Sequence, residues 1–387
     1  MENELNVKAP SKRLVALDVF RGATIAAMIL VNNPGSHEHV YAPLQHADWH
    51  GWTFTDWIFP FFLFMVGVSV VLSFQKRLQQ GASRRQLLKH VLRRSAILFM
   101  IGLFINGFPF GLVPGHQFSF SSWRIMGILQ RICLAYLFAS LIYLYSTRYG
   151  QIVWTVVLLI GYRLMLAWIP VPGYGAGVLQ PAGNLCWYVD SHLLAGHTWY
   201  FAPVKGFDPE GLLSTIPAIA SVLCGVLAGY WLQEPRPPAE KTSGMFVAGN
   251  ALLLFGVIWN VWFPINKNLW TSSYVVFMAG WALICLAMIY WIVDIKGYRK
   301  WAKPFVIFGM NAITVFTLAE LLANLSWAIA WQKSNGNITT LHDVIYETIF
   351  LPLVSPINAS LLFTIVFVLL IYLVAWVMWK EKWFIKI

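Results

Sequence analysis

The chain has 387 residues, of which 58% are hydrophobic, 16% aromatic and 11% charged, with a formal net charge of +11. Soluble domains carry about 25% charged residues, so this composition excludes an ordinary soluble enzyme, a disordered chain and a secreted disulfide scaffold. The composition indicates an integral membrane protein, in which the Lys and Arg residues concentrate in the cytoplasmic loops.

Ten apolar segments are long enough to cross a bilayer, which takes about 20 helical residues. The stretch 1–13 is polar and lacks the features of a cleaved signal peptide, so we expect it to remain as a tail. Pro352 and Pro356 predict that the last segment is a short piece followed by a full helix from about Asn358. The segments are 14–32, 56–75, 92–108, 124–145, 151–169, 212–232, 245–263, 271–293, 304–330 and 345–378.

The Lys and Arg residues are distributed unevenly between the two sides of this layout. With the N-terminus inside, 20 of the 27 fall in inside segments and 3 in outside loops. We therefore predict an all-α polytopic membrane protein with about ten transmembrane helices and both termini cytoplasmic. Residues 1–13 form a cytoplasmic tail and 14–387 one transmembrane domain, with a candidate lobe boundary at the linker-like stretch 233–243. The basic loops orient the chain and contact lipid headgroups, and we expect no nucleic-acid partner.

Charged side chains inside a membrane are costly, so each is a functional candidate. Asp18 and Arg21 lie three residues apart and share one helical face. They form an internal ion pair, a wall for a phosphate-bearing ligand, or both.

A second polar group occurs in the fourth segment. Arg124 and Arg131 are seven residues apart, two turns along one helical face, and with Gln130 they can line a polar cavity. Arg124 can instead reach the outer surface. We interpret Arg163 as structural, with Glu320 or a carbonyl group as its partner, and Glu320 can alternatively handle protons.

The loop between the first two segments holds the densest set of reactive side chains. Imidazole is well suited to take a proton at neutral pH, which makes His46 a candidate base. An amide such as Asn32 can stabilise an oxyanion. Asp48 and Asp56 can fix the tautomer of an imidazole, and Trp49 offers a ring for stacking.

The same loop raises the possibility of a metal site. His37, His39, His46 and His50 supply four imidazoles, and His46 and His50 would share a face if the segment were helical. Its Pro and Gly residues argue for a loop, and neither Cys nor an HExxH motif accompanies the histidines. We therefore expect no metal.

Two later outside segments add candidate residues. Asp208 and Glu210 precede the sixth segment, where carboxylates also serve as N-terminal caps. Asn266, Lys267 and Trp270 belong to a turn rich in polar donors, for which a capped turn is the structural alternative.

Seven stretches along nearly the whole chain carry a family resemblance. They are RLVALDVFRG at 13–22, VN at 31–32, QHADWHGWTFTDWIFPFFLFMVG at 45–67, RIMGILQRI at 124–132, DPEGLLSTI at 208–216, FPINKNLWTSSYV at 263–275 and PFVIFGMNAI at 304–313. Together they resemble the heparan-α-glucosaminide N-acetyltransferase family, including its bacterial NagX-type members.

The resemblance implies an acyltransferase that uses cytoplasmic acetyl-CoA and acetylates an amino sugar across the membrane. It places the catalytic histidine at His46 and the asparagine at Asn32, beside the alternative Asn33. Asp18 and Arg21 then lie where the CoA phosphates enter. The family also suggests a homodimer. The lysosomal member has a lumenal region and a span that this sequence lacks, so we expect a protein of the bacterial inner membrane.

These considerations define the expected site. We expect catalysis by His46 and Asn32, with His46 as general base in a direct transfer rather than as carrier of an acetyl group. The competing interpretation is a sugar or amino-sugar transporter, although the two halves show no repeat of the kind many transporters have. The expected acetyl-CoA contacts are Asp18, Arg21, Arg124, Gln130 and Arg131, and the expected contacts to the amino-sugar or glycan acceptor are Asp48, Trp49, Asp56, Asp208, Glu210, Asn266, Lys267 and Trp270.

Overall fold

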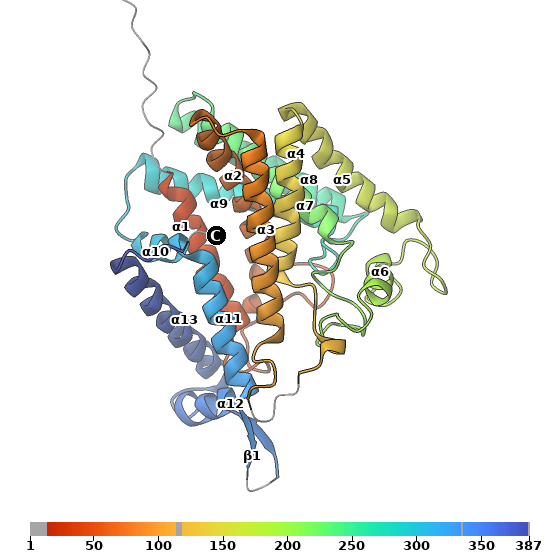
Figure 1. Ribbon diagram of the computed structural model, residues 1–387, viewed down its shortest axis with the longest axis vertical. Helices are drawn as coiled ribbons and strands as arrows, with labels where there is room; N and C mark the ends of the chain where they lie inside the picture. Colours follow the sequence, from red (N-terminus) through yellow and green to blue (C-terminus); the bar gives the residue numbers. More distant parts are fainter. Residues whose placement is uncertain (1–13, 114–117, 334–335, 386–387) are drawn as a thin grey trace, which may run out of the picture.

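The computed structural model describes residues 14–113, 118–333 and 336–385, so the predicted tail 1–13 lies outside the described residues. Helices make up most of this part of the chain (Figure 1). A small antiparallel hairpin of β1 (Ala330–Gln332) and β2 (Ile338–Thr340) projects from one end of the helical body. The prediction of an all-α polytopic fold is confirmed.

Eight of the described helical segments are long and apolar enough to cross a membrane. The helices in them are α1 (Val15–Asn32), α2 (Ile58–Gln79), α4 (Ile128–Tyr145), α5 (Arg148–Trp168), α7 (Thr215–Gln233), α8 (Pro238–Asn260), α9 (Ser272–Tyr290) and α13 (Pro356–Lys380). A ninth crossing results if α10 (Lys303–Met310) and α11 (Ala312–Ala328), which meet at an angle of 83°, are taken as one broken span.

The remaining predicted segment, 92–108, belongs to α3 (Arg84–Gly107). This helix has the length of a span but is too polar to count as one by composition, because its first half is strongly basic. The shorter elements are η1 (Ala42–Leu44), η2 (Phe54–Trp57), η3 (Phe120–Ser122), α6 (Leu185–Leu193), η4 (Trp291–Ile295), α12 (Leu341–Ile345) and η5 (Tyr346–Phe350). As predicted, a short helical piece (α12 with η5) precedes the full helix α13 at the end of the chain.

The start of α4 differs from the prediction. The segment 124–145 becomes helical only at Ile128, and the residues before it are extended. The Asn106 side chain donates hydrogen bonds to the carbonyl oxygens of Arg124 (3.1 Å) and Met126 (3.0 Å), which engages them outside any helix. The prediction that Arg124 shares a helical face with Arg131 is therefore wrong.

Small residues allow close helix crossings at the centre of the molecule. A Cβ on Gly67 of α2 would overlap the carbonyl oxygen of Val222 in α7, and one on Gly225 of α7 would overlap that of Phe64. Such contacts drive helix association where lipid removes the hydrophobic effect between helices. They bring α2 and α7 into close contact at the centre of the molecule.

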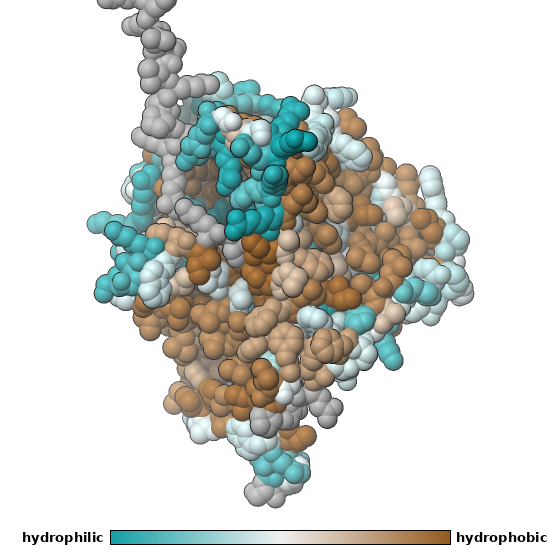
Figure 2. Space-filling view, in the orientation of Figure 1, coloured by the Kyte–Doolittle hydropathy of each residue, from teal (hydrophilic) through white to brown (hydrophobic). Residues whose placement is uncertain are grey.

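The molecular surface agrees with a membrane location. Figure 2 shows a broad hydrophobic surface across the middle of the molecule. Hydrophilic side chains gather at the top of the view, over the ends of α2 and α3. This end carries the basic turn 76–85, which the charge distribution places on the cytoplasmic side.

Candidate functional site

The predicted residues converge on a cavity of about 670 Å³, called here the His46 cavity. Its volume lies within the range of about 300–1,000 Å³ that is usual for small-molecule sites. It is formed where α1 and α11 meet four loops, at the end of the bundle opposite the basic turn. Six predicted site residues line it: Asn32, His46, Asp48, Arg124, Glu210 and Lys267.

The His46 ring is oriented by Asp56. Nδ1 of the ring lies 2.7 Å from Asp56 Oδ1. Because an ionised carboxylate can only accept, Nδ1 carries the hydrogen and Nε2 is left as the basic nitrogen. The other oxygen, Asp56 Oδ2, accepts from the backbone N–H groups of Ala47 (3.1 Å) and Thr53 (2.9 Å), so the carboxylate itself is held in place.

The position of Asp56 follows from the local sequence. Thr53 and Asp56 form a capping box at the start of η2, in which each side chain bonds the backbone of the other. The Tyr274 hydroxyl also donates to the carbonyl oxygen of Asp56 at 2.5 Å. With its side chain 1% exposed, Asp56 lies behind His46 and does not face the cavity. Its expected contact with the acceptor is therefore wrong, and the alternative role of fixing the imidazole tautomer fits.

Lys267 places an ammonium group beside the same imidazole. Its Nζ lies 3.1 Å from His46 Nδ1, 3.2 Å from Nε2 and 3.7 Å from Asp56 Oδ1. Burial lowers the pKa of Lys267. Burial and, next, the Lys267 charge lower the pKa of His46 below its ordinary value of 6.5, although Asp56 acts in the opposite direction. His46 is therefore unprotonated at neutral pH, as a general base must be.

Asn32 and its neighbour Asn33 have different environments. Asn32, the last residue of α1, lines the cavity and places Nδ2 3.5 Å from Glu320 Oε1 of α11. The Asn33 side chain turns back and donates to the carbonyl oxygen of Ile29 at 2.8 Å. Of the two, the geometry favours Asn32. Glu320 also lines the cavity, whereas Arg163 donates to the carbonyl oxygen of Trp262 at 3.3 Å, so of the two predicted partners of Arg163 the structure shows the carbonyl group.

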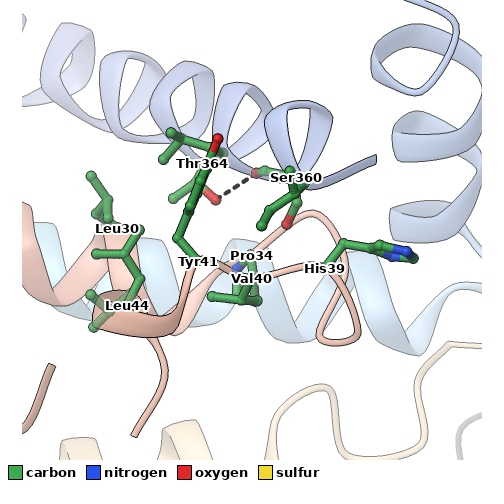
Figure 3. A pocket seen from close by; sticks show the side chains of 11 residues that line it. Leu30, Pro34, His39, Val40, Tyr41, Leu44, Ser360 and Thr364 are labelled. Carbon is green, nitrogen blue, oxygen red and sulfur yellow. Dashed lines mark hydrogen bonds between the residues drawn. The ribbon is translucent and has the colours of Figure 1, made fainter. Parts of the chain in front are cut away.

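The loop that carries His46 is anchored to α13. The Tyr41 hydroxyl donates to Asn358 Oδ1 at 2.6 Å, and the Thr364 hydroxyl donates to the Asn33 carbonyl oxygen at 2.9 Å. Figure 3 shows the loop lying along the first turns of α13, with the side chain of His39 pointing away from Tyr41. These bonds give a loop rich in Pro and Gly a defined path between Asn32 and His46.

Arg124 binds two carboxylates at the cavity wall. Its Nε and Nη2 donate to the two oxygens of Asp208 at 2.9 and 2.7 Å, and Nη2 also donates to Glu210 Oε2 at 2.7 Å. Burial by itself raises the pKa of Glu210, but the charges of Arg124, Arg131 and Lys267 together outweigh it and the pKa is lowered. The capping alternative for these acids is wrong, because α7 begins only at Thr215.

Several predicted contacts lie beneath the cavity wall. Arg131 is fully buried, with its guanidinium 5.0 Å from the Trp270 ring centre and a hydrogen bond to the Ser214 hydroxyl. Asn266 donates to the carbonyl oxygen of Trp49 at 2.7 Å. These side chains support the wall and do not face the described cavities. The predicted contacts that line neither the His46 cavity nor the cavity around Arg21 are Asp18, Trp49, Asp56, Gln130, Arg131, Asp208, Asn266 and Trp270.

Arg21 lines a different cavity, of about 240 Å³, with Ser69 of α2 and Arg94 of α3. Arg21 Nη2 donates to Ser69 Oγ at 2.9 Å, and Asp18 lies 3.6 Å from the same guanidinium. Arg124, Gln130 and Arg131 lie elsewhere, so the expected set of acetyl-CoA contacts is split. Arg94 was missed because the sequence places it in a run of cytoplasmic basic residues.

The two cavities approach each other along α2. Phe59 lines the His46 cavity and Phe62 lines the Arg21 cavity. Three residues of helix rise by about 4.5 Å, so the two spaces are lined by adjacent turns of the same helix.

The loop histidines have separate partners. His39 Nδ1 lies 3.3 Å from the Ser36 hydroxyl and His50 Nδ1 lies 3.3 Å from Asn266 Nδ2, whereas His46 meets Asp56. Among the described residues, no three His, Cys, Asp or Glu side chains are grouped as metal ligands.

Comparisons with known proteins agree with the geometry. A family model described as heparan-alpha-glucosaminide N-acetyltransferase, catalytic, matches residues 13–258. The chain is 30% identical to heparan-alpha-glucosaminide N-acetyltransferase of Mus musculus over 98% of its own length, and 30% identical to that of Homo sapiens over 86%. It spans 61% and 57% of the lengths of these two relatives. The chain belongs to the heparan-α-glucosaminide N-acetyltransferase family.

Proposed function

We propose that the protein is a transmembrane N-acetyltransferase, which moves an acetyl group from cytoplasmic acetyl-CoA to the amine of a glucosamine-type sugar on the periplasmic side. The observation that carries this proposal is His46, whose tautomer is set by Asp56 and whose ring faces a cavity of about 670 Å³. Placement in the bacterial inner membrane and a homodimeric state are further proposals, and both rest on the family.

The reaction requires an amine nucleophile and a proton acceptor. An amino sugar enters as an ammonium ion, so His46 Nε2 first takes a proton from its nitrogen. The free amine attacks the thioester carbonyl carbon, forming the C–N bond and a tetrahedral oxyanion that the Asn32 amide stabilises. The C–S bond then breaks, the thiolate takes a proton from His46 and leaves as the free thiol, and the nitrogen of the new amide releases its second proton to water.

The acidic residues of the cavity favour a cationic acceptor. Asp48, Glu210 and Glu320 place carboxylates in its wall. An ammonium group is attracted to these carboxylates by a long-range electrostatic force that does not act on a neutral sugar. This preference brings the amine into the space beside His46.

The donor is proposed to enter through the Arg21 cavity. Arg21 and Arg94 place two guanidinium groups in a space on the cytoplasmic half of α1, α2 and α3. Guanidinium groups bind phosphate well, and CoA carries several phosphates. The acetyl end of the donor then passes to the His46 cavity beside Phe59 and Phe62, where the two cavities approach each other along α2.

The test is His46→Gln in the purified full-length protein, with labelled acetyl-CoA and glucosamine. General-base catalysis contributes about 10²–10⁴-fold, so turnover should fall by that factor while acetyl-CoA binding is retained. His39→Gln, a change in the same loop outside the His46 cavity, should leave turnover unchanged.

Near-normal turnover by His46→Gln would refute the assignment. Label retained on the protein after exposure to acetyl-CoA alone would replace direct transfer with an acetyl-histidine route. Glucosamine uptake into proteoliposomes without acetyl-CoA would instead support the transporter alternative.

A further inference from the structure

A third cavity, of about 610 Å³, opens beside the His46 cavity and is called here the vestibule. It extends from the shared wall over the ends of α3 and α11 and the loops that precede α4 and α7. The two spaces are neighbours with a shared wall, because five residues line both of them: Arg124, Trp199, Phe201, Glu320 and Asn324.

Aromatic rings lead from the shared wall into the vestibule. Trp199 and Phe201 line both spaces, with ring centres 6.1 Å apart, whereas Tyr200 lines the vestibule alone. The Tyr200 ring lies 5.2 Å from that of Phe201 and is 90% exposed. An exposed tyrosine at the mouth of a cavity offers an apolar face together with a polar edge.

Hydroxyl groups surround these rings. Ser119, Ser122 and Thr198 all line the vestibule. A sugar ring has the matching chemistry, because its C–H face stacks on an aromatic ring and its hydroxyls exchange hydrogen bonds with neutral polar groups.

The charges of the two spaces disfavour an anionic sugar. Among their described lining residues the Lys and Arg side chains are Arg124 and Lys267, and both already contact carboxylates. Asp48, Glu210 and Glu320 add negative charge. Sulfated glycans are bound by clusters of available Lys and Arg side chains, which this wall does not provide.

We propose that the vestibule is a second sugar subsite, and that the preferred acceptor is an unsulfated amino-sugar oligosaccharide with neutral or cationic residues. Its terminal glucosamine occupies the His46 cavity, and the next residue stacks against Tyr200. The inference rests on the proposed acetyl transfer and adds to it the length and charge of the acceptor.

The experiment compares three acceptors with the purified full-length protein and acetyl-CoA. They are glucosamine, a disaccharide of two glucosamine residues, and a disaccharide in which the terminal glucosamine is linked to a sulfated uronate. One stacking contact is worth up to a factor of about ten in affinity. The diglucosamine should therefore exceed glucosamine in kcat/KM by about that factor, and the sulfated disaccharide should be the poorest acceptor.

Variants of Tyr200 separate the vestibule from the reaction itself. Tyr200→Ala should reduce kcat/KM for diglucosamine to the level of glucosamine and leave the kinetics with glucosamine unchanged. Tyr200→Phe, which keeps the ring, should retain the preference. Tyr149→Ala removes a comparably exposed tyrosine from the first turn of α5 and should have no effect.

Equal kcat/KM for glucosamine and diglucosamine, or a preference that survives Tyr200→Ala, would overturn the subsite while acetyl transfer stands. Preference for the sulfated disaccharide would overturn the inference that the acceptor is unsulfated. Failure to acetylate any of the three acceptors would contradict the proposed function itself, and the subsite with it.

Discussion

Lys267 contacts both nitrogens of the His46 ring, at 3.1 and 3.2 Å, so the charge of one group controls the protonation of the other. Burial is the first cause of the lowered pKa of His46, and the Lys267 ammonium is the second. Catalysis needs the unprotonated imidazole. As the pH is lowered, the wild-type enzyme should therefore lose activity only at pH values below 6.5, the ordinary pKa of histidine.

Removing the charge of Lys267 should therefore raise the pKa of His46. In Lys267→Met we expect the acid limb of the pH profile of kcat/KM to move to higher pH. Lys267→Arg keeps a cation at this position and should leave the limb near its wild-type position. A limb that stays in place or moves to lower pH in Lys267→Met would show that His46 is not the titrating base.

Individual site residues differ in how far the sequence reveals them. His46 and Asn32 could be predicted, because residue chemistry and a motif both point to them. The burial of Asn266 and Trp270 could not be predicted. The sequence of a polar turn does not show whether its side chains face a cavity or bond the backbone of the turn, as Asn266 does. Glu320 was recognisable as a costly buried charge, but its partner Asn32 is 288 positions away in the chain.

At the scale of elements, the proposed donor cavity lies where α1, α2 and α3 face α10 and α11. The first three helices each supply one polar side chain, respectively Arg21, Ser69 and Arg94. Hydropathy predicts these helices individually, because each apolar run is local in sequence. That Arg21 and Arg94 line the same cavity depends on how the helices pack, and no local pattern in the sequence predicts this packing.

Loss of Arg94 should weaken donor binding specifically. In Arg94→Met we expect the KM for acetyl-CoA to rise by about tenfold, the scale of one charge-assisted contact to phosphate, with little change in the KM for glucosamine. Arg93→Met removes a neighbouring, exposed cation from the same helix and is the matched control. An equal effect of both changes would mean that the basic end of α3 attracts the donor only through its overall charge.

The break between α10 and α11 shows where local pattern fails. The segment 304–330 reads as one apolar run, yet its two halves meet at 83°. Asn311 stands at the break, and its side chain donates to the carbonyl oxygen of Trp383 and accepts from the backbone N–H of Ile385. A bend fixed by bonds to residues more than 70 positions away is invisible in hydropathy.

At the scale of the whole molecule, charge and chemistry occupy opposite ends. The basic turn between α2 and α3 marks one end of the hydrophobic surface (Figure 2), and the His46 cavity lies towards the other. The uneven distribution of Lys and Arg between alternate loops predicted that the basic turn and the His46 loop lie at opposite ends, because the side on which a loop lies correlates with its content of Lys and Arg. The convergence of Asn32, Arg124 and Lys267 from separate loops on one cavity is a property of the folded chain.

In the proposed reaction, one protein passes an acetyl group from a donor on one side of the membrane to an amine on the other. The most direct measurement uses proteoliposomes with glucosamine trapped inside and acetyl-labelled acetyl-CoA outside, because neither reactant crosses the bilayer unaided. We expect labelled N-acetylglucosamine inside the vesicles with the wild-type protein and none above background with His46→Gln. Product formed only when both reactants are on the same side, or formed equally by His46→Gln, would contradict the proposed reaction.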